Sequence, residues 1–180
     1  MDGRSWNRQC VLTNGDFMSA TNPIRVLIVD DHPEVRRTLT SVLRAHADVE
    51  IVGEAATGEE AILRTEQLQP TVVLMDINIP ALDGIAATRV ITSKSPEIVV
   101  IGLSGHVQDY MRYAIIKAGG FGLFQKDEAV GNLYSFIRQA LASKQSGQTT
   151  ISPTQGDRVN VEIAEQPPAS TMTSRNPPSI

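Results

Sequence analysis

Two adjacent carboxylates, Asp30 and Asp31, stand at the end of the apolar segment 24–29 (IRVLIV), where the chain is expected to turn. Two like charges side by side repel each other unless a cation or a proton lies between them. The pair has two interpretations: a helix cap with a solvated neighbour, which is a common role of Asp at such a position, or half of a cation site. The other polar residues that the fold brings to the same place decide between them.

Three further polar residues follow later apolar segments. Asp76 ends VVLMD, Ser104 ends VVIGLS, and Lys126 comes directly after GLFQ. If these segments are parallel strands, their carboxyl ends lie along one edge of the sheet, which is where doubly wound α/β proteins bind ligands. The sequence therefore predicts that three carboxylates, a hydroxyl group and an ammonium group converge on one rim.

The chemistry of such a rim follows from its charges. Three carboxylates in one cleft need a counter-charge, and a set of oxygen ligands without a His or Cys cage suits Mg²⁺. With Mg²⁺ on one side and Lys126 on the other, the charge of an incoming phosphoryl group is matched, and Asp76 can attack phosphorus to give an aspartyl phosphate. Ser104 can then donate a hydrogen bond to a phosphoryl oxygen.

The three histidines do not add to this set of ligands. His32, His46 and His106 are not spaced as a metal cage, and we interpret them as surface or capping residues. Asp83, which precedes Gly84, has the pattern of a residue that starts a turn or a helix, and we give it a structural role.

The elements that must position these residues alternate along the chain. The predicted strands are the apolar runs 24–29, 49–55, 71–75, 97–103 and 120–124. The segments with apolar residues at helical spacing are 33–46, 58–68, 84–94, 107–118 and 127–142. Near-continuous apolar strands separated by single helices predict a doubly wound (βα)₅ domain of the α/β class, with a parallel sheet buried on both faces.

Four segments, VLIVDDHPEVRR, VVLMDINIPALDGI, VVIGLSGH and GLFQKDE, resemble the receiver domain of two-component response regulators, in particular the branch that usually precedes a LuxR-type helix-turn-helix. The resemblance covers residues 24–142 and implies a flavodoxin-like fold with strand order 2-1-3-4-5. It implies Mg²⁺ ligation by Asp30, Asp31, Asp76 and the backbone carbonyl of Asn78. It further implies phosphorylation of Asp76 by a sensor histidine kinase or a phosphotransfer protein, with Ser104 as the switch hydroxyl and Lys126 bridging to the phosphate.

One position departs from the pattern of many receivers, which have an aromatic residue three positions before the lysine. Here that position is Leu123. An aromatic ring buries a large rigid area and so makes a two-position element, whereas leucine packs similarly in both states. We therefore expect phosphorylation to change the face formed by residues 107–142 only weakly.

Composition limits the class of protein. The chain has 180 residues, of which 41% are hydrophobic and 20% charged, and no apolar run approaches the roughly 18 residues of a membrane span. Residues 1–17 lack the apolar stretch of a secretory signal, and the single cysteine cannot form an internal disulfide, so we expect a cytoplasmic protein. Residues 24–142 contain 11 Lys or Arg against 15 Asp or Glu, an acidic balance that argues against nucleic-acid binding.

The two ends of the chain differ from the domain between them. Residues 1–23 are unpatterned and are predicted to be an unstructured extension. Residues 143–180 hold five prolines, no aromatic residue and many Ser, Thr and Gln, and are predicted to be a disordered tail. The tail has no pair of patterned basic helices, so an output domain of the helix-turn-helix type is not recognisable in it.

The leading hypothesis is a phosphorylated signalling protein that catalyses only its own phosphorylation and dephosphorylation and acts through an unknown downstream protein; a homodimer is compatible with it. The alternative is a transcriptional regulator that has lost, or been cut from, its DNA-binding domain. An FMN-binding flavodoxin fits less well, because the acidic loop DDHPEV would repel the cofactor phosphate. A haloacid-dehalogenase-type phosphatase fits less well too, because Asp76-Ile77-Asn78 lacks its second acid.

Overall fold

Strands and helices alternate along the chain in the order that the sequence predicts. The computed structural model describes residues 22–80 and 82–146. Its strands are β1 (Ile24–Val29), β2 (Val49–Ala55), β3 (Val72–Asp76), β4 (Val99–Ser104) and β5 (Gly122–Gln125). Its helices are α1 (Pro33–Arg44), α2 (Gly58–Leu68), α3 (Gly84–Lys94), α4 (Asp109–Lys117), the short 3₁₀ helix η1 (Lys126–Glu128) and α5 (Ala129–Gln145).

The five strands form one parallel sheet in the order β2-β1-β3-β4-β5. This confirms the predicted flavodoxin-like, doubly wound α/β fold. From β1 the chain moves outward to β2 and then returns to β3 on the other side of β1, so strand order reverses between β1 and β3. The crevice at such a reversal, beyond the carboxyl ends of the strands, is the usual ligand site of this architecture. Asp30 and Asp76 stand there.

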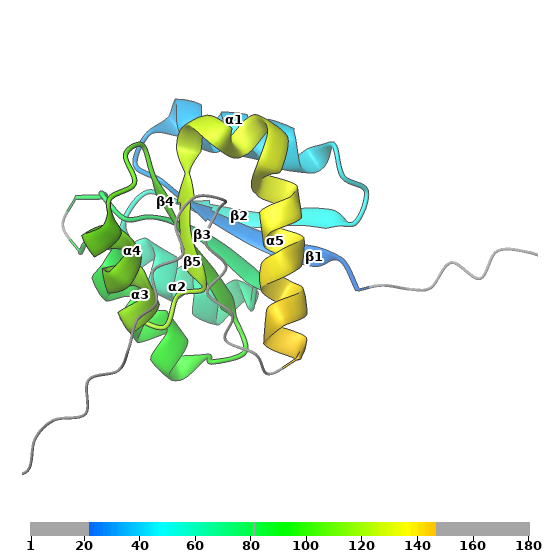
Figure 1. Ribbon diagram of the computed structural model, residues 1–180. Helices are drawn as coiled ribbons and strands as arrows, with labels where there is room; N and C mark the ends of the chain where they lie inside the picture. Colours follow the sequence, from blue (N-terminus) through cyan, green and yellow to red (C-terminus); the bar gives the residue numbers. More distant parts are fainter. Residues whose placement is uncertain (1–21, 81, 147–180) are drawn as a thin grey trace, which may run out of the picture. The chain divides into compact units, whose positions relative to one another are not determined.

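Alternate residues of each strand point to opposite faces, and each face has its own helical layer (Figure 1). Val26 and Ile28 of β1 pack with α1 and α5, whereas Leu27 and Val29 pack with α2 and α3. A smaller cluster joins α4 to β5 through Ile115 and Leu123. Full burial of an aliphatic side chain of this size contributes about 1.5–3 kcal/mol, so these clusters hold the helices to the sheet.

Local sequence signals explain where several helices begin. Pro33 occupies the first turn of α1, where its missing N–H costs no hydrogen bond. Thr57 caps α2 by accepting from the backbone N–H of Glu60 at 3.2 Å. Asp83 caps α3 by accepting from the backbone N–H of Ala86 at 2.7 Å, which confirms its predicted structural role.

Helix α5 corrects one predicted boundary. The sequence predicts a last helix over residues 127–142, but α5 continues to Gln145, because Ser, Lys and Gln are compatible with a helix. The rest of the predicted tail, residues 147–180, and residues 1–21 of the predicted extension lie outside the described residues. Asn22 and Pro23 precede β1 without regular secondary structure.

Tyr134 and Arg138 of α5 also tie this helix to the turn before β2. The Tyr134 hydroxyl donates to Asp48 at 2.8 Å, Arg138 Nη1 donates to the same carboxylate at 2.9 Å, and the Tyr134 ring stacks on His46 at 3.7 Å between centroids. The hydrogen bond from Tyr134, helped by Arg138, holds the pKa of Asp48 below its ordinary value. His46 therefore has a packing role at the edge of the sheet opposite to the acidic rim.

Candidate functional site

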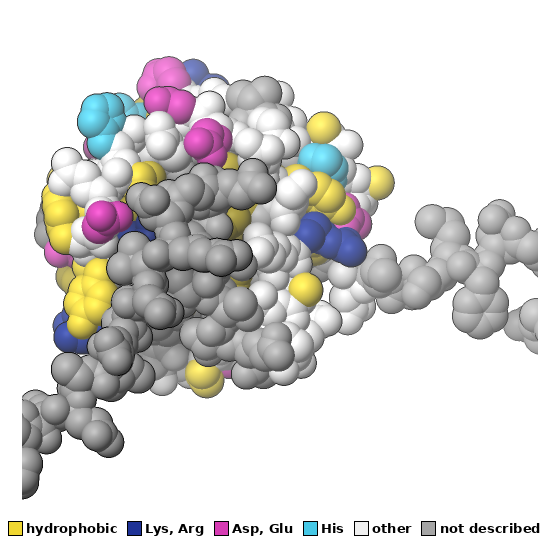
Figure 2. Space-filling model, viewed as in Figure 1, with side chains coloured by type: hydrophobic (Ala, Val, Ile, Leu, Met, Phe, Trp, Pro, Cys, Tyr) yellow, Lys and Arg dark blue, Asp and Glu magenta, His cyan; other side chains and the backbone are white. Residues whose placement is uncertain are grey.

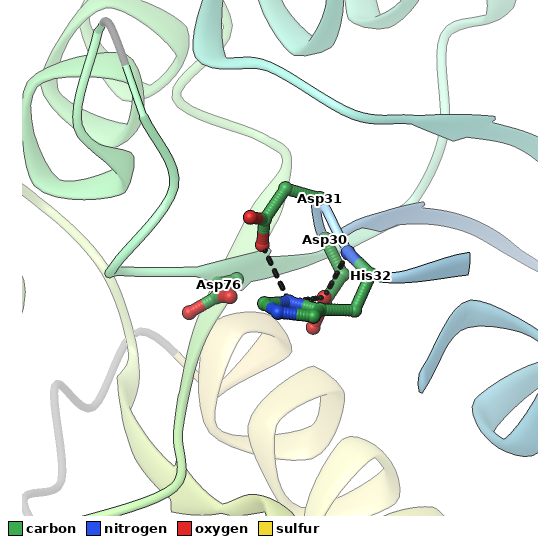
Figure 3. Close-up of side chains that lie close together, drawn as sticks. All are labelled: Asp30, Asp31, His32 and Asp76. Atoms are coloured by element: carbon green, nitrogen blue, oxygen red, sulfur yellow. Dashed lines mark hydrogen bonds and ion pairs between the residues drawn. The ribbon is translucent and has the colours of Figure 1, made fainter. Parts of the chain in front are cut away.

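Asp30, Asp31 and Asp76 converge at the carboxyl ends of β1 and β3, as the sequence predicts (Figure 3). One ligand atom from each of these residues and from His32 lies within 4.8 Å of all the others. The side chains of Asp30 and Asp76 are 0% and 3% exposed, whereas that of Asp31 is 31% exposed. Two buried carboxylates and one at the surface therefore form a single acidic cluster.

Lys126 connects the two buried carboxylates. Its Nζ donates to Asp30 Oδ2 at 2.6 Å and to Asp76 Oδ2 at 2.7 Å. Burial by itself lowers the pKa of the Lys126 ammonium group, but the hydrogen bonds to Asp30 and Asp76 together raise it by more, so the net pKa lies above its ordinary value. Lys126 is therefore a fixed positive charge shared by the ends of β1 and β3.

The second oxygen of each buried carboxylate holds the turn that follows its own strand. Asp30 Oδ1 accepts from the backbone N–H of His32 at 2.9 Å, and Asp76 Oδ1 accepts from the backbone N–H of Asn78 at 3.0 Å. The two residues thus have the same hydrogen-bond pattern. One oxygen accepts from the backbone N–H two residues ahead, and the other accepts from Lys126. Both carboxylates are held rigidly, so the position of the cluster is set by the sheet.

The side-chain oxygen Oδ1 of Asp31 indicates whether this cluster suits a hard cation such as Mg²⁺. Its Oδ1 is buried and accepts no hydrogen bond from the described residues, although His32 Nδ1 lies 2.8 Å away. Buried polar atoms of this kind call for a partner, and carboxylate oxygens are the ligands that Mg²⁺ prefers. The donor set therefore fits Mg²⁺. The backbone carbonyl of Asn78 as a further ligand stays a prediction.

His32 belongs to this cluster, which the sequence interpretation missed. Its side chain is 66% exposed, as expected for a surface residue, but its Nδ1 faces Asp30 at 3.4 Å and Asp31 at 2.8 Å (Figure 3). Spacing along the chain gave no sign of a metal cage. The signal that could have revealed His32 is its position directly after the acid pair.

Ser104 stands on the predicted rim, but its hydroxyl group is bonded within its own loop. It is buried, donates to the backbone carbonyl of His106 at 2.6 Å and accepts from the backbone N–H of the same residue at 3.2 Å. A phosphoryl oxygen at Asp76 would compete with the His106 carbonyl for this hydroxyl. The turn between β4 and α4 is therefore the part of the rim whose hydrogen bonds must change if Ser104 contacts a phosphate.

Leu123 lies behind the rim, where it is 4% exposed and packs with Ile77 and Ile115. Gly102 on the neighbouring strand makes room for it, since a Cβ there would lie 2.9 Å from Leu123 and 3.0 Å from Ile115. Leu123 thus fills the space that faces α4, next to the residue that follows Asp76. The weak response expected of the face formed by α4, β5 and α5 stays a prediction.

Comparison with known proteins agrees with this geometry. Residues 26–138 match the response regulator receiver domain family. The chain belongs to this family. The response regulator GacA of Pseudomonas protegens is 36% identical over 130 residues, which are 72% of this chain and 59% of GacA. A solved LuxR-family two-component response regulator from Aurantimonas sp. SI85-9A1 is 28% identical, covers 73% of this chain and 91% of its own, and superposes with a TM-score of 0.66.

The receiver domain also occurs in longer proteins with other activities. Protein-glutamate methylesterase/protein-glutamine glutaminase 2 of Methanospirillum hungatei is 38% identical over 111 residues, which are 61% of this chain and 32% of that protein. The chain thus spans less than two thirds of the length of both curated relatives. What membership of this family shows for the present chain is a receiver domain, the signalling module of two-component response regulators.

Two features of the receiver bear on its surroundings. Among the described residues, no helix combines the length and the apolar character needed to cross a membrane. On the described part of the face shown in Figure 2, Lys and Arg side chains are scattered among acidic and hydrophobic ones and do not gather in one patch.

Replacing Asp31 with Ala is expected to weaken Mg²⁺ binding by more than about tenfold, because the variant loses an oxygen ligand. The protein should remain folded, since the side chain is partly exposed and its loss relieves repulsion within the cluster. Calorimetric titration measures the affinity. Asp109→Ala, which removes an exposed carboxylate of α4 outside the cluster, is the matched control and should bind Mg²⁺ as the unaltered protein does. Equal or tighter binding by Asp31→Ala would contradict the assignment.

Proposed function

We propose that this protein is a cytoplasmic response regulator that accepts a phosphoryl group on Asp76 from a sensor histidine kinase in a two-component phosphorelay and then signals through protein partners. The observation that carries the proposal is the pairing of Lys126 with both buried carboxylates, at 2.6 Å to Asp30 and 2.7 Å to Asp76. It places a fixed cation beside a buried acid at the strand-order reversal, as phosphoryl transfer to a carboxylate requires.

The residues of the cluster have distinct roles in this mechanism. A carboxylate oxygen of Asp76 attacks phosphorus, the bond from phosphorus to the donor breaks, and the donor atom keeps the electron pair. Lys126 stays charged and stabilises the phosphoryl oxygens. Asp30 and Asp31, with Asp76 and the Asn78 carbonyl, would hold Mg²⁺, and the ion would supply positive charge to offset that of the phosphoryl group.

Ser104 gives the new phosphate a means to change the surface. Its hydroxyl leaves the His106 carbonyl, to which it now donates at 2.6 Å, and donates to a phosphoryl oxygen. The turn between β4 and α4 then rearranges. A downstream protein, or a second copy of this chain, that contacts the turn or α4 would respond to phosphorylation through this rearrangement.

The alternative is a transcriptional regulator whose DNA-binding part lies outside this chain. Two observations favour it. The match to GacA covers only 59% of the GacA chain, and the Aurantimonas relative is described as a LuxR-family regulator. In both readings the receiver itself works in the same way. DNA binding is not assigned to the receiver, whose charged residues are predominantly acidic.

The test is phosphorylation of the purified protein by a small acyl phosphate such as acetyl phosphate. With Mg²⁺ we expect the intact mass to increase by that of one phosphoryl group, and hydroxylamine to remove it, since hydroxylamine cleaves acyl phosphates and leaves serine phosphates intact. In EDTA the labelling should be lost, because the repulsion between the donor and the acidic cluster is no longer offset. Equal labelling in EDTA, or a hydroxylamine-resistant product, would contradict the proposal.

A further inference from the structure

The backbone that carries the acid pair is held from both sides. The N–H of Asp30 donates to the Ala55 carbonyl of β2 at 3.1 Å, so it continues the hydrogen bonding of the sheet one residue beyond β1. The carbonyl of Asp30 has left the sheet and accepts from Arg36 Nη1 at 2.6 Å. Arg36 lies on α1, one turn after Pro33. Its guanidinium group therefore holds the chain at the point where it turns from β1 toward Asp31.

Arg36 is itself fixed by a neighbouring strand. Its Nε donates to Glu54 Oε2 on β2 at 2.9 Å, and the second oxygen of Glu54 accepts from the Thr40 hydroxyl of α1 at 3.4 Å. The Arg36 side chain is only 19% exposed, so its pair with Glu54 is partly shielded from water. A planar guanidinium group with several donors suits this double contact, which a lysine cannot reproduce in full.

This arrangement assigns Arg36 a role that its charge alone would not predict. A positive charge close to a cation site opposes the binding of Mg²⁺ by simple repulsion. Yet Arg36 makes no hydrogen bond or ion pair with a carboxylate of the cluster. It donates to the backbone from which Asp30 and Asp31 project, and Glu54 offsets its charge. We propose that Arg36, held by Glu54, is a positioning residue that keeps the acid pair in place for Mg²⁺. The proposal rests on the proposed function, because it takes the acidic cluster as the Mg²⁺ site.

Two accounts of Arg36 make opposite predictions, which calorimetric titration with Mg²⁺ can separate. If Arg36 positions the acid pair, Arg36→Gln should weaken Mg²⁺ binding about tenfold, as is common when the groups that orient metal ligands are removed. If Arg36 acts by charge alone, the same change should strengthen binding. Arg36→Lys keeps the charge and loses part of the contact, so only the positioning account predicts weaker binding for it. If Arg36→Gln fails to fold, the Mg²⁺ affinity of Arg36→Lys still distinguishes the positioning account from the charge account.

A double-mutant cycle with Glu54→Gln adds an independent readout. If Glu54 acts only by holding Arg36, Glu54→Gln should weaken Mg²⁺ binding in the unaltered protein and add little in the Arg36→Gln background. If Glu54 acts by charge alone, Glu54→Gln should change the Mg²⁺ affinity by the same factor in the unaltered protein and in Arg36→Gln. Additive effects would therefore overturn the proposal.

The matched control is Arg138→Gln, which breaks the guanidinium–carboxylate pair with Asp48 at 2.9 Å, before the amino end of β2 and away from the acidic rim. It should leave the affinity for Mg²⁺ unchanged, with urea unfolding measured on every variant to report any loss of stability. Unchanged or tighter binding by Arg36→Gln, where the unaltered protein binds Mg²⁺, would overturn this inference alone. If the unaltered protein binds no Mg²⁺, the proposed function fails with it.

Discussion

Replacing Asp76 with Asn is expected to reduce phosphorylation by acetyl phosphate at least about a thousandfold, because an amide is no substitute for the carboxylate nucleophile. Asn has nearly the same size, so the turn after β3 should persist, with the amide oxygen able to accept from the Asn78 N–H as Asp76 Oδ1 does at 3.0 Å. Lys126 keeps its contact with Asp30. The loss should therefore come from the chemistry and not from unfolding. Intact mass spectrometry over a time course measures it.

The control for this substitution is Asp83→Asn. Asp83 lies seven residues further along the chain, caps α3 and is exposed, and Asn is an equally good helix cap. Its phosphorylation should equal that of the unaltered protein. If Asp76→Asn were labelled at the normal rate, peptide mapping would show another acceptor, and the assignment of Asp76 would be wrong.

Replacing Gly84 with Ala is expected to destabilise the protein by about 3 kcal/mol, at the upper end of the usual cost of overpacking. A Cβ at this position would clash with the Asp76 carbonyl oxygen and would lie 2.8 Å from Ile77 Cα. Both neighbours are backbone atoms, so no side chain can rotate away, and either α3 or the end of β3 must shift. Because that shift moves Asp76, phosphorylation should slow as well. Urea unfolding gives the change in the free energy of unfolding.

Gly131→Ala is the matched control for the glycine substitution. A Cβ at Gly131 meets nothing within 4 Å, and the residue lies inside α5, where Ala is favoured over Gly by about 1 kcal/mol. This variant should be slightly more stable than the unaltered protein. If Gly84→Ala were as stable as Gly131→Ala, the close packing of α3 against the backbone of Asp76 would not be a constraint on the fold.

The fold could be predicted because each strand is a short apolar run and each helix has its own spacing. The predicted ends differ from the observed ones by one or two residues at β3, β4 and β5, since an apolar run does not specify where the first hydrogen bond of the sheet forms. The acidic rim could be predicted for a related reason. Once the strands are parallel, their carboxyl ends share an edge, and Asp30, Asp76 and Lys126 are brought together by topology alone.

The rest of the site depends on contacts that no local pattern encodes. Arg36 and Glu54 are 18 residues apart and meet only because α1 packs beside β2. The Nδ1 of His32 faces the acids through the conformation of one turn, and the hydroxyl of Ser104 is bonded to the His106 carbonyl rather than aimed at Asp76. Sequence indicates which chemical groups reach the rim; the directions in which they point are set by tertiary packing.

Helix α5 begins almost at Lys126 and ends far from it. Only η1 separates the lysine from the first residue of α5, and the helix has 17 residues, which corresponds to a rod of about 25 Å. A tilt of about 5° at Ala129 would displace Gln145 by roughly 2 Å over this length. Lys126 therefore lies close to the point about which such a tilt would occur, and Gln145 lies at the opposite end of the helix. A tilt that starts beside Lys126 is therefore largest at Gln145, at the far end of the helix.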